Sequence, residues 1–249
     1  MTAILEARNI CKQFGDFRAL ADMSIAIAPN TVHAVIGPNG AGKTTFFNIL
    51  SGVLRPTSGE VVFQGKSVTA LPVYDRVHLG MARSFQVTNI FQSFSVHENV
   101  RLAVQAMMRK ESRTFWRGPA RHSGMLDRVD ELLSSMGLKE HARTRAGDLS
   151  HGAQRTLEIA MTVASRPKLI FLDEPLAGMS IDDIHRSKEL IRSLKETMTV
   201  VLIEHNMSVV MDISDCITVM AQGARIAEGM PNEIRSQESV RSAYLGSRG

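Results

Sequence analysis

A glycine-rich segment near residue 40 carries the strongest chemical signal in this sequence of 249 residues. It has the phosphate-loop pattern, spaced glycines that end in Lys43 and Thr44, with a strand predicted over 32–36 and a helix over 44–50. Its backbone N–H groups and the helix start suit bound phosphates, Lys43 would reach the β- and γ-phosphates, and Thr44 would bind Mg²⁺. A chance match is the alternative, but the flanking strand and helix argue against it. The predicted nucleotide-binding residues here are Gly37, Pro38, Asn39, Gly40, Ala41, Gly42, Lys43, Thr44 and Thr45.

Two adjacent carboxylates, Asp173 and Glu174, follow the apolar run 169–172. Successive residues of a strand point to opposite sides, so the two carboxylates can have different roles. We expect Asp173 to hold Mg²⁺ through water and Glu174 to polarise the water that attacks the γ-phosphate. Alone, such a pair is more often a helix cap or a loop. The phosphate loop earlier in the chain favours the catalytic interpretation.

Two further polar positions are candidates because of their order in the chain. Ser150 and Gly152 precede an amphipathic pattern, and Ser150 stands where a helix N-cap belongs, which alone would explain this serine. His205 follows a second apolar run, 199–203, where a single histidine is more often structural. The succession of phosphate loop, serine-glycine helix start, acid pair and histidine favours a functional interpretation.

The elements that must position these residues alternate between strand and helix. Apolar residues recur three and four apart within 96–164, which predicts helices, and a further helix is predicted over 184–196. The predicted strands are 4–11, 23–28, 32–36, a hairpin strand over 59–65, 168–172 and 199–203. Strand, glycine turn, helix and later buried strands predict an α/β fold, with a parallel sheet covered on both faces and an inserted helical subdomain.

Composition limits the function. The chain has 44% hydrophobic and 22% charged residues and a formal net charge of +4, values typical of a soluble globular protein and weak support for a polyanion partner. Cys11 and Cys216 form no metal-binding pattern or disulfide framework, so we expect a reducing compartment. Glu6 and Arg8 interrupt any N-terminal signal sequence, and no apolar run approaches the roughly 20 residues of a membrane span.

Together these motifs resemble the ATP-binding subunits of ABC transporters, and the resemblance covers nearly the whole chain. It implies a P-loop NTPase fold with a RecA-like core, an N-terminal antiparallel β subdomain and an inserted helical subdomain. It also implies a single nucleotide-binding domain over 1–249. Within it, the core and β subdomain would occupy 1–86 and 165–228, the helical subdomain with the signature motif 87–164, and a C-terminal tail 229–249.

The resemblance implies roles for further residues. Phe14 matches the aromatic residue that stacks on adenine, with Phe17 as a weaker candidate and a core phenylalanine as the alternative. Gln86 matches the glutamine that joins the core to the helical subdomain and senses Mg²⁺ and the attacking water. Residues 149–153 match the family's signature, and His205 matches its switch histidine. The implied catalytic residues are Glu174, His205 and Gln86, and the implied metal-binding residues are Thr44, Gln86 and Asp173.

In the family, two subunits face each other head to tail, and each ATP lies between one phosphate loop and the other subunit's signature helix. A helix start bearing Ser150 and Gly152 suits a γ-phosphate from a partner, so an isolated chain should hydrolyse ATP poorly. The implied cofactors are ATP and Mg²⁺. The implied partners are a second ABC ATPase subunit, identical or different, transmembrane permease subunits and, indirectly, a periplasmic or extracellular solute-binding protein, with no nucleic acid. The implied location is peripheral, on the cytoplasmic face of the inner or plasma membrane.

Three positions depart from the family pattern. His151 replaces the first glycine of the signature, Ala153 its usual glutamine, and Ser180 the aspartate of the loop 177–180 that follows the acid pair. Whether the loop 177–180 contacts a second subunit as it does in the family is therefore an open question. A narrower resemblance, to the importers of branched-chain amino acids and urea, rests on segments 83–86, 149–152, 175–179 and 204–207, the tail 243–246 and the insertion around 109–124.

Several functions are compatible with the motifs. The resemblance favours an importer of branched-chain amino acids, with urea or amide import and lipopolysaccharide export as alternatives. A soluble ABC ATPase that acts on nucleic acid is a further alternative. Its one support is the basic, aromatic segment 109–121, whose ordinary interpretation is a solvated helical hairpin. The sequence lacks the second cassette, long coiled coil or zinc module usual in such proteins.

Overall fold

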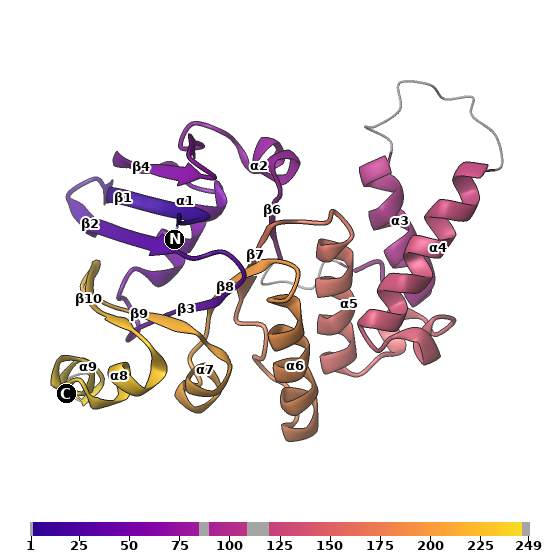
Figure 1. Cartoon of the computed structure of the whole chain (residues 1–249). Coiled ribbons are helices and arrows are strands. Elements are labelled where there is room, and N and C mark those ends of the chain that lie inside the picture. The colour runs from indigo at the N-terminus through magenta and orange to yellow at the C-terminus, as the bar shows by residue number, and fades with distance from the viewer. Residues whose placement is uncertain (1, 85–89, 109–119, 246–249) are drawn as a thin grey trace.

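A computed structural model describes residues 2–84, 90–108 and 120–245. Figure 1 shows the arrangement of the helices and strands. In chain order they are β1 (Leu5–Phe14), β2 (Phe17–Ile27), β3 (Val32–Ile36), α1 (Lys43–Ser51), β4 (Ser58–Phe63), β5 (Lys66–Ser67), α2 (Val73–Leu79), β6 (Met81–Arg83), α3 (Val96–Met108), α4 (Ala120–Ser135), η1 (Lys139–His141), η2 (Ala146–Asp148), α5 (His151–Val163), β7 (Leu169–Asp173), α6 (Ile181–Leu194), β8 (Thr199–Ile203), α7 (Met207–Ile213), β9 (Cys216–Ala221), β10 (Ala224–Gly229), α8 (Pro231–Ser236) and α9 (Glu238–Leu245).

An antiparallel sheet at the N-terminal end has the strand order β2-β1-β4-β5. Strands β1 and β2 form a hairpin that closes at the pair Phe14 and Phe17. Both strands extend beyond the predicted ranges 4–11 and 23–28. The reason is that the residues near the hairpin turn are exposed and lack the alternation of apolar and polar residues that marks a half-buried strand.

The central sheet has the strand order β10-β9-β3-β8-β7-β6. Strand β3 pairs in parallel with β8 and β9, and β7 pairs in parallel with β8 and β6. The carboxyl ends of parallel strands meet at one edge of a sheet, where ligands bind in open α/β folds. The phosphate loop follows β3, the acid pair begins at the last residue of β7, and His205 follows β8. One edge of the sheet thus gathers residues from distant parts of the sequence.

Apolar side chains fill both faces of the central sheet. Phe171 of β7 and Val201 of β8 face α1 and the antiparallel sheet, and the ring of Phe47 in α1 meets that of Phe171 edge-on at a centroid distance of 5.3 Å. The alternate residues Leu172 and Leu202 face the opposite layer of helices. Because both faces are covered, β7 and β8 are fully buried, as their uninterrupted apolar runs predicted.

Helices α3, α4 and α5 come between β6 and β7 in the chain. Helix α3 packs against α4 and α5, and α5 packs against α6. In Figure 1, α3 and α4 project to one side of the central sheet while α5 lies nearer to it. Buried residues of these helices belong to the same apolar cluster as one sheet face, so the helical part continues the core.

The predicted fold class is confirmed: an α/β architecture combines an antiparallel sheet with a mainly parallel one. Strand β6 was not predicted, because three residues are too few to show a hydrophobic period. Within the described ranges, no helix is long and apolar enough to cross a membrane.

Candidate functional site

The phosphate loop joins β3 to α1, and its backbone requires glycine at both ends. Gly37 has φ 153°, and a Cβ atom there would lie 2.2 Å from the carbonyl oxygen of Met220. Gly42 has φ 93°, and its Cβ would lie 2.8 Å from the carbonyl oxygen of Ala19. Gly42 is the N-cap of α1 and offers no side chain to the first N–H groups of that helix. Those groups can therefore bind an anion.

A cavity of about 370 Å³ lies against this loop. Lys43 is buried, and its Nζ donates hydrogen bonds to the carbonyl oxygens of Gly37 at 2.7 Å and Pro38 at 2.9 Å. Burial lowers the pKa of Lys43, and the negative charge of Glu174 opposes that shift. A cation in a glycine-rich cradle suits bound phosphates. The lining residues are Phe17, Ala19, Asn39, Gly40, Ala41, Gly42, Lys43, Thr44, Thr45, Glu174 and His205.

Glu174 and His205 are in direct contact at this cavity. Glu174 starts the turn after β7 with φ 46°, and its N–H donates to the carbonyl oxygen of Ile203, 3.0 Å away, at the end of β8. Nε2 of His205 lies 2.5 Å from Oε1 of Glu174. A carboxylate held in this way can orient a water molecule and accept its proton.

Glu204 supports this contact, and sequence reasoning missed it. Its carboxylate accepts hydrogen bonds from the backbone N–H groups of Leu176 at 2.9 Å and His205 at 3.2 Å. Burial raises the pKa of Glu204, and the backbone hydrogen bonds oppose that shift. Glu204 therefore joins the turn after β7 to the residue that reaches Glu174. The available signal was an acidic residue directly after a buried strand.

Asp173, the last residue of β7, is 3% exposed. Its Oδ2 lies 3.0 Å from a guanidinium nitrogen of Arg83, a residue of β6 that sequence reasoning also missed. Thr44 lines the phosphate cavity, whereas Asp173 does not and stands directly before the lining residue Glu174. A threonine hydroxyl and one carboxylate suit Mg²⁺, which keeps several waters and shares oxygens with a nucleotide. The described residues contain no cluster of three or more His, Cys, Asp and Glu that could hold a metal without phosphates.

The two candidate adenine-binding phenylalanines flank the hairpin turn of β1 and β2. Phe14 is 47% exposed and Phe17 67% exposed, so the alternative of a core phenylalanine is wrong for both. Phe17 lines the phosphate cavity, whereas the Phe14 ring lies 4.9 Å from Nζ of Lys12. An exposed aromatic ring at the phosphate cavity, as Phe17 presents, suits the stacking of a base.

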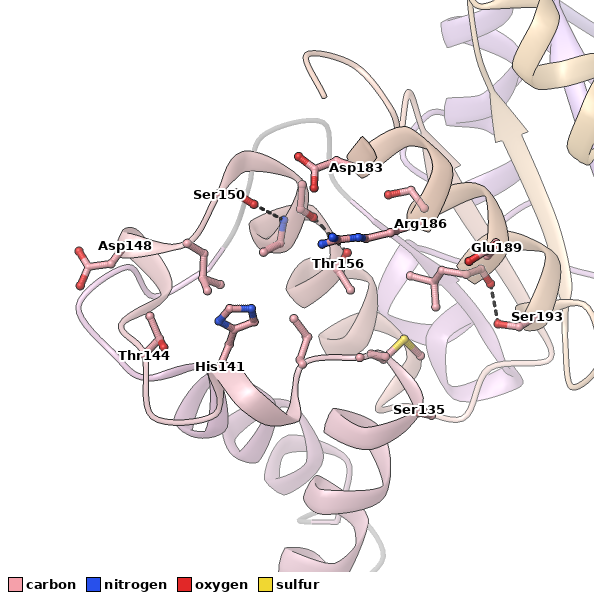
Figure 2. Close-up of a pocket in the computed structure, with 18 residues that line it drawn as sticks. Ser135, His141, Thr144, Asp148, Ser150, Thr156, Asp183, Arg186, Glu189 and Ser193 are labelled. Atoms are coloured by element: carbon pink, nitrogen blue, oxygen red, sulfur yellow. Dashed lines mark hydrogen bonds between the residues drawn. The ribbon is translucent and has the colours of Figure 1, made fainter. Parts of the chain in front are cut away.

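Ser150 and Gly152 lie on a different cavity. Ser150 Oγ accepts a hydrogen bond from the N–H of Ala153, 3.2 Å away, and caps α5. Figure 2 shows Ser150 near the start of α5. Ser150 and Gly152 line a cavity of about 680 Å³ together with residues of α6 and the end of α4. The residues that line this cavity and those that line the phosphate cavity share no member. One chain therefore does not place Ser150 in its own phosphate site.

Two of the departures from the family pattern have structural roles. Nε2 of His151 lies 3.2 Å from the carbonyl oxygen of Ala177, in the loop after the acid pair. Ser180 Oγ accepts from the N–H of Asp183, 3.2 Å away, and caps α6. A Cβ on Gly152 would lie 2.7 Å from Cβ of Asp183. The start of α5 is thus packed closely against the loop and helix that follow the acid pair.

Gln86 lies outside the described residues, so its catalytic and metal-binding role stays a prediction. Most of the basic segment 109–121 also lies outside them.

Residues 20–177 match the ABC transporter family, and the chain therefore belongs to that family as an ATP-binding subunit and an ATPase. It is 36% identical to the high-affinity branched-chain amino acid transport ATP-binding protein LivG of Escherichia coli K12, with 98% of each chain covered. It is 31% identical to the lipopolysaccharide export system ATP-binding protein LptB of Haemophilus influenzae, again with 98% of each chain covered.

The fold agrees with this assignment. The crystal structure of the ADP conformation of MJ1267, an ATP-binding cassette of an ABC transporter, superimposes with a TM-score of 0.86. It is 28% identical to this chain, and the superposition covers 99% of this chain and 100% of MJ1267. The resemblance that the motifs indicated is confirmed.

Proposed function

We propose that this ATPase serves an importer in which MgATP closes a dimer of ATPase subunits and closure drives the transport of branched-chain amino acids. One observation supports the proposed dimer: Lys43, Glu174 and His205 line the phosphate cavity, whereas Ser150 lines a separate cavity. A site that holds a triphosphate on one side needs donors on its open side. A second subunit that presents Ser150 and Gly152 would supply them.

Within one site, each residue would act on a different part of the nucleotide. Lys43 and the first N–H groups of α1 would bind the phosphates, and Phe14 or Phe17 would stack on the adenine. Thr44 and Asp173 would hold Mg²⁺, which when bound supplies positive charge to the phosphate oxygens. Glu174, held by His205, would orient the attacking water and accept its proton.

Complementation between two inactive variants tests the shared site. If the chain pairs with itself, Lys43→Ala and Ser150→Arg variants should each lack hydrolysis alone. Mixing them forms a heterodimer with one intact site, which combines Lys43 of one chain with Ser150 of the other. We expect partial recovery of ATP hydrolysis in the mixture, and a mixture as inactive as its components would count against the shared site. A paralogue as natural partner would be detected by co-purification from the source cells.

Docking on permease subunits has support from an exposed aromatic pair. Phe91 and Phe94 precede α3, are both exposed, and stack with ring centroids 5.5 Å apart. Exposed apolar side chains grouped in this way suit a protein partner. The proposal places the chain peripherally at the cytoplasmic face of the membrane, on transmembrane permease subunits that receive solute from a binding protein. Phe91→Ser with Phe94→Ser should reduce recovery of the permeases in a detergent pull-down without reducing ATP binding.

Similarity to LivG along 98% of both chains supports branched-chain amino acids as the substrate, and similarity to LptB supports lipopolysaccharide export as a second candidate. Uptake of radiolabelled leucine, valine and urea, measured in a strain that lacks this gene, separates the candidates. Leucine and valine uptake should fall and should return with the wild-type gene but not with a Glu174→Gln gene. Unchanged uptake with lipopolysaccharide retained at the inner membrane would favour export instead.

A further inference from the structure

Arg83 occupies a buried position between the elements that carry the nucleotide site. It is the last residue of β6, and its side chain is 9% exposed. Strand β6 pairs in parallel with β7, so Arg83 lies beside the end of the strand that carries the acid pair. A buried cation is costly unless its hydrogen bonds are made, which raises the question of what this guanidinium holds.

Among the residues that the structure describes, its hydrogen-bond partners come from two other elements. One terminal nitrogen donates to Oδ2 of Asp173 at 3.0 Å, at the end of β7. The other donates to Oδ1 of Asn48 at 2.6 Å and to Oγ of Ser51 at 2.8 Å, both in α1. The guanidinium also lies 5.0 Å from the ring centroid of Phe47 in the same helix. A planar fork with donors fixed in direction can connect the two elements, and a lysine ammonium group cannot reproduce that geometry.

The two connected elements each carry a proposed magnesium ligand. Asp173 is itself one of them, and Asn48 stands four residues after Thr44 in α1, so the two lie on the same side of that helix. Arg83 uses Oδ2 of Asp173, and a carboxylate has a second oxygen that can accept from a metal-bound water. The guanidinium therefore fixes the orientation of one ligand relative to the helix that holds the other.

We propose that Arg83 is a positioning residue for Mg²⁺, which locks the Asp173 carboxylate to the helix carrying Thr44 so that both ligands keep their spacing. This inference rests on the proposed magnesium site, which Thr44 and Asp173 form with the nucleotide phosphates. The competing explanation is that Arg83 only stabilises the fold. The two explanations differ in whether loss of Arg83 changes the dependence on Mg²⁺.

Arg76 provides a matched control. It is also buried and also donates to α1, through the carbonyl oxygens of Ile49 at 3.1 Å and Leu50 at 2.6 Å. Its acceptors in the described part of the chain are backbone carbonyls, so it stabilises the helix without touching a proposed metal ligand. Arg76→Gln therefore measures what the loss of a buried arginine beside α1 does by itself.

The test uses the full chain with Arg83→Gln, Arg83→Lys and Arg76→Gln. ATP binding is measured by calorimetry at stepwise Mg²⁺ concentrations and in EDTA, hydrolysis is measured over the same Mg²⁺ series, and thermal unfolding is recorded without nucleotide. We expect Arg83→Gln to raise the half-saturating Mg²⁺ concentration by about 10- to 100-fold, the usual cost of losing a group that orients a metal ligand. Arg83→Lys should give a smaller rise, and binding in EDTA should not change. Arg76→Gln should lower only the unfolding temperature.

Equal Mg²⁺ dependence in the Arg83 and Arg76 variants would overturn the inference and leave Arg83 with a structural role. If Arg83→Gln does not fold, Arg83→Lys and an Asn48→Ala, Ser51→Ala double variant, which removes the acceptors of the two Arg83 hydrogen bonds to α1, are tested in its place. Asp173→Asn separates this inference from the proposed function. If Asp173→Asn leaves the Mg²⁺ dependence unchanged, the magnesium site itself is misassigned. If it raises the Mg²⁺ requirement while the Arg83 variants do not, only the role of Arg83 is wrong.

Discussion

His205 contacts Glu174 directly, with 2.5 Å between imidazole Nε2 and carboxylate Oε1. The two residues follow neighbouring parallel strands, β8 and β7, and the N–H of Glu174 donates to the last residue of β8. The backbone of the sheet edge therefore sets the distance between them. Both line the phosphate cavity, so this contact points a carboxylate at the place where phosphates would bind.

Replacing Glu174 by Gln should separate ATP binding from hydrolysis. Glutamine keeps the size of the side chain but cannot accept a proton at neutral pH, so kcat should fall by about 10²- to 10⁴-fold. The ATP dissociation constant should stay near that of the wild type, measured by equilibrium binding. Lys43→Ala serves as the control that loses binding itself. Unaltered steady-state hydrolysis by Glu174→Gln would assign the base to another residue.

His205 should contribute to kcat only through its contact with Glu174. His205→Ala removes the contact that orients the carboxylate, and we expect a loss of kcat with little change in ATP affinity. Residues that act as a unit are not additive, so the double variant with Glu174→Gln should be no slower than Glu174→Gln alone. The measurement is kcat for the wild type, both single variants and the double variant. Additive losses would show that His205 acts independently of Glu174.

The hairpin of β1 and β2 should provide the platform for adenine. Stacking of a base on an aromatic ring contributes about 1–3 kcal/mol, so loss of the stacking ring should weaken ATP binding by about 5- to 150-fold. Phe14→Ala and Phe17→Ala, titrated with ATP and with inorganic triphosphate, identify which ring stacks. Triphosphate affinity should not change in either variant. Normal ATP affinity in both variants would remove the hairpin from the binding site.

Gly152 should be required for the stability of a single chain, in addition to its proposed role toward the nucleotide of a partner subunit. Its Cβ would lie 2.5 Å from Cγ and 2.7 Å from Cβ of Asp183, so Gly152→Ala forces α5 and α6 apart. Overpacking of this kind costs about 1–3 kcal/mol in the free energy of unfolding, measured by urea titration. Gly124→Ala, in α4 with nothing within 4 Å of the new Cβ, is the matched control and should not destabilise the chain. Equal stability of both variants would contradict the close packing.

His33 should make the fold less stable in mild acid. Its Nε2 lies 2.7 Å from Oγ1 of Thr218, and burial lowers the pKa of His33 from 6.5 to about 4. Below pH 6.5 the unfolded chain takes up a proton that the folded chain does not, so stability falls as pH falls from 6.5 towards 4. Between pH 7 and 5 this group alone accounts for about 2 kcal/mol.

Urea titrations of the wild type and His33→Gln at pH 7 and pH 5 measure this effect. From pH 7 to pH 5, the unfolding free energy of the wild type should fall by about 2 kcal/mol more than that of His33→Gln. An unchanged difference would mean that folded His33 titrates normally.

Much of the site was predictable because its parts are local in the sequence. The phosphate loop, the acid pair after an apolar run and the serine before α5 each occupy a few consecutive residues. Arg83 was missed because it forms no local pattern. Glu204 directly follows a buried strand, but that pattern does not show that its carboxylate binds the turn after β7. Arg83 belongs to a strand of three residues, and its partner Asp173 is 90 positions away.

The sequence by itself determined the buried strands β3, β7 and β8 and the residues equipped for phosphate chemistry, because hydrophobic periodicity and glycine conformations act over a few residues. Tertiary structure alone decided which distant side chains meet. Parallel pairing of β3, β8 and β7 brings Lys43, His205 and Glu174 to one cavity, and packing of α5 against α6 directs Ser150 to another. Those positions depend on strand order and helix packing, which are fixed by contacts between segments far apart in the chain.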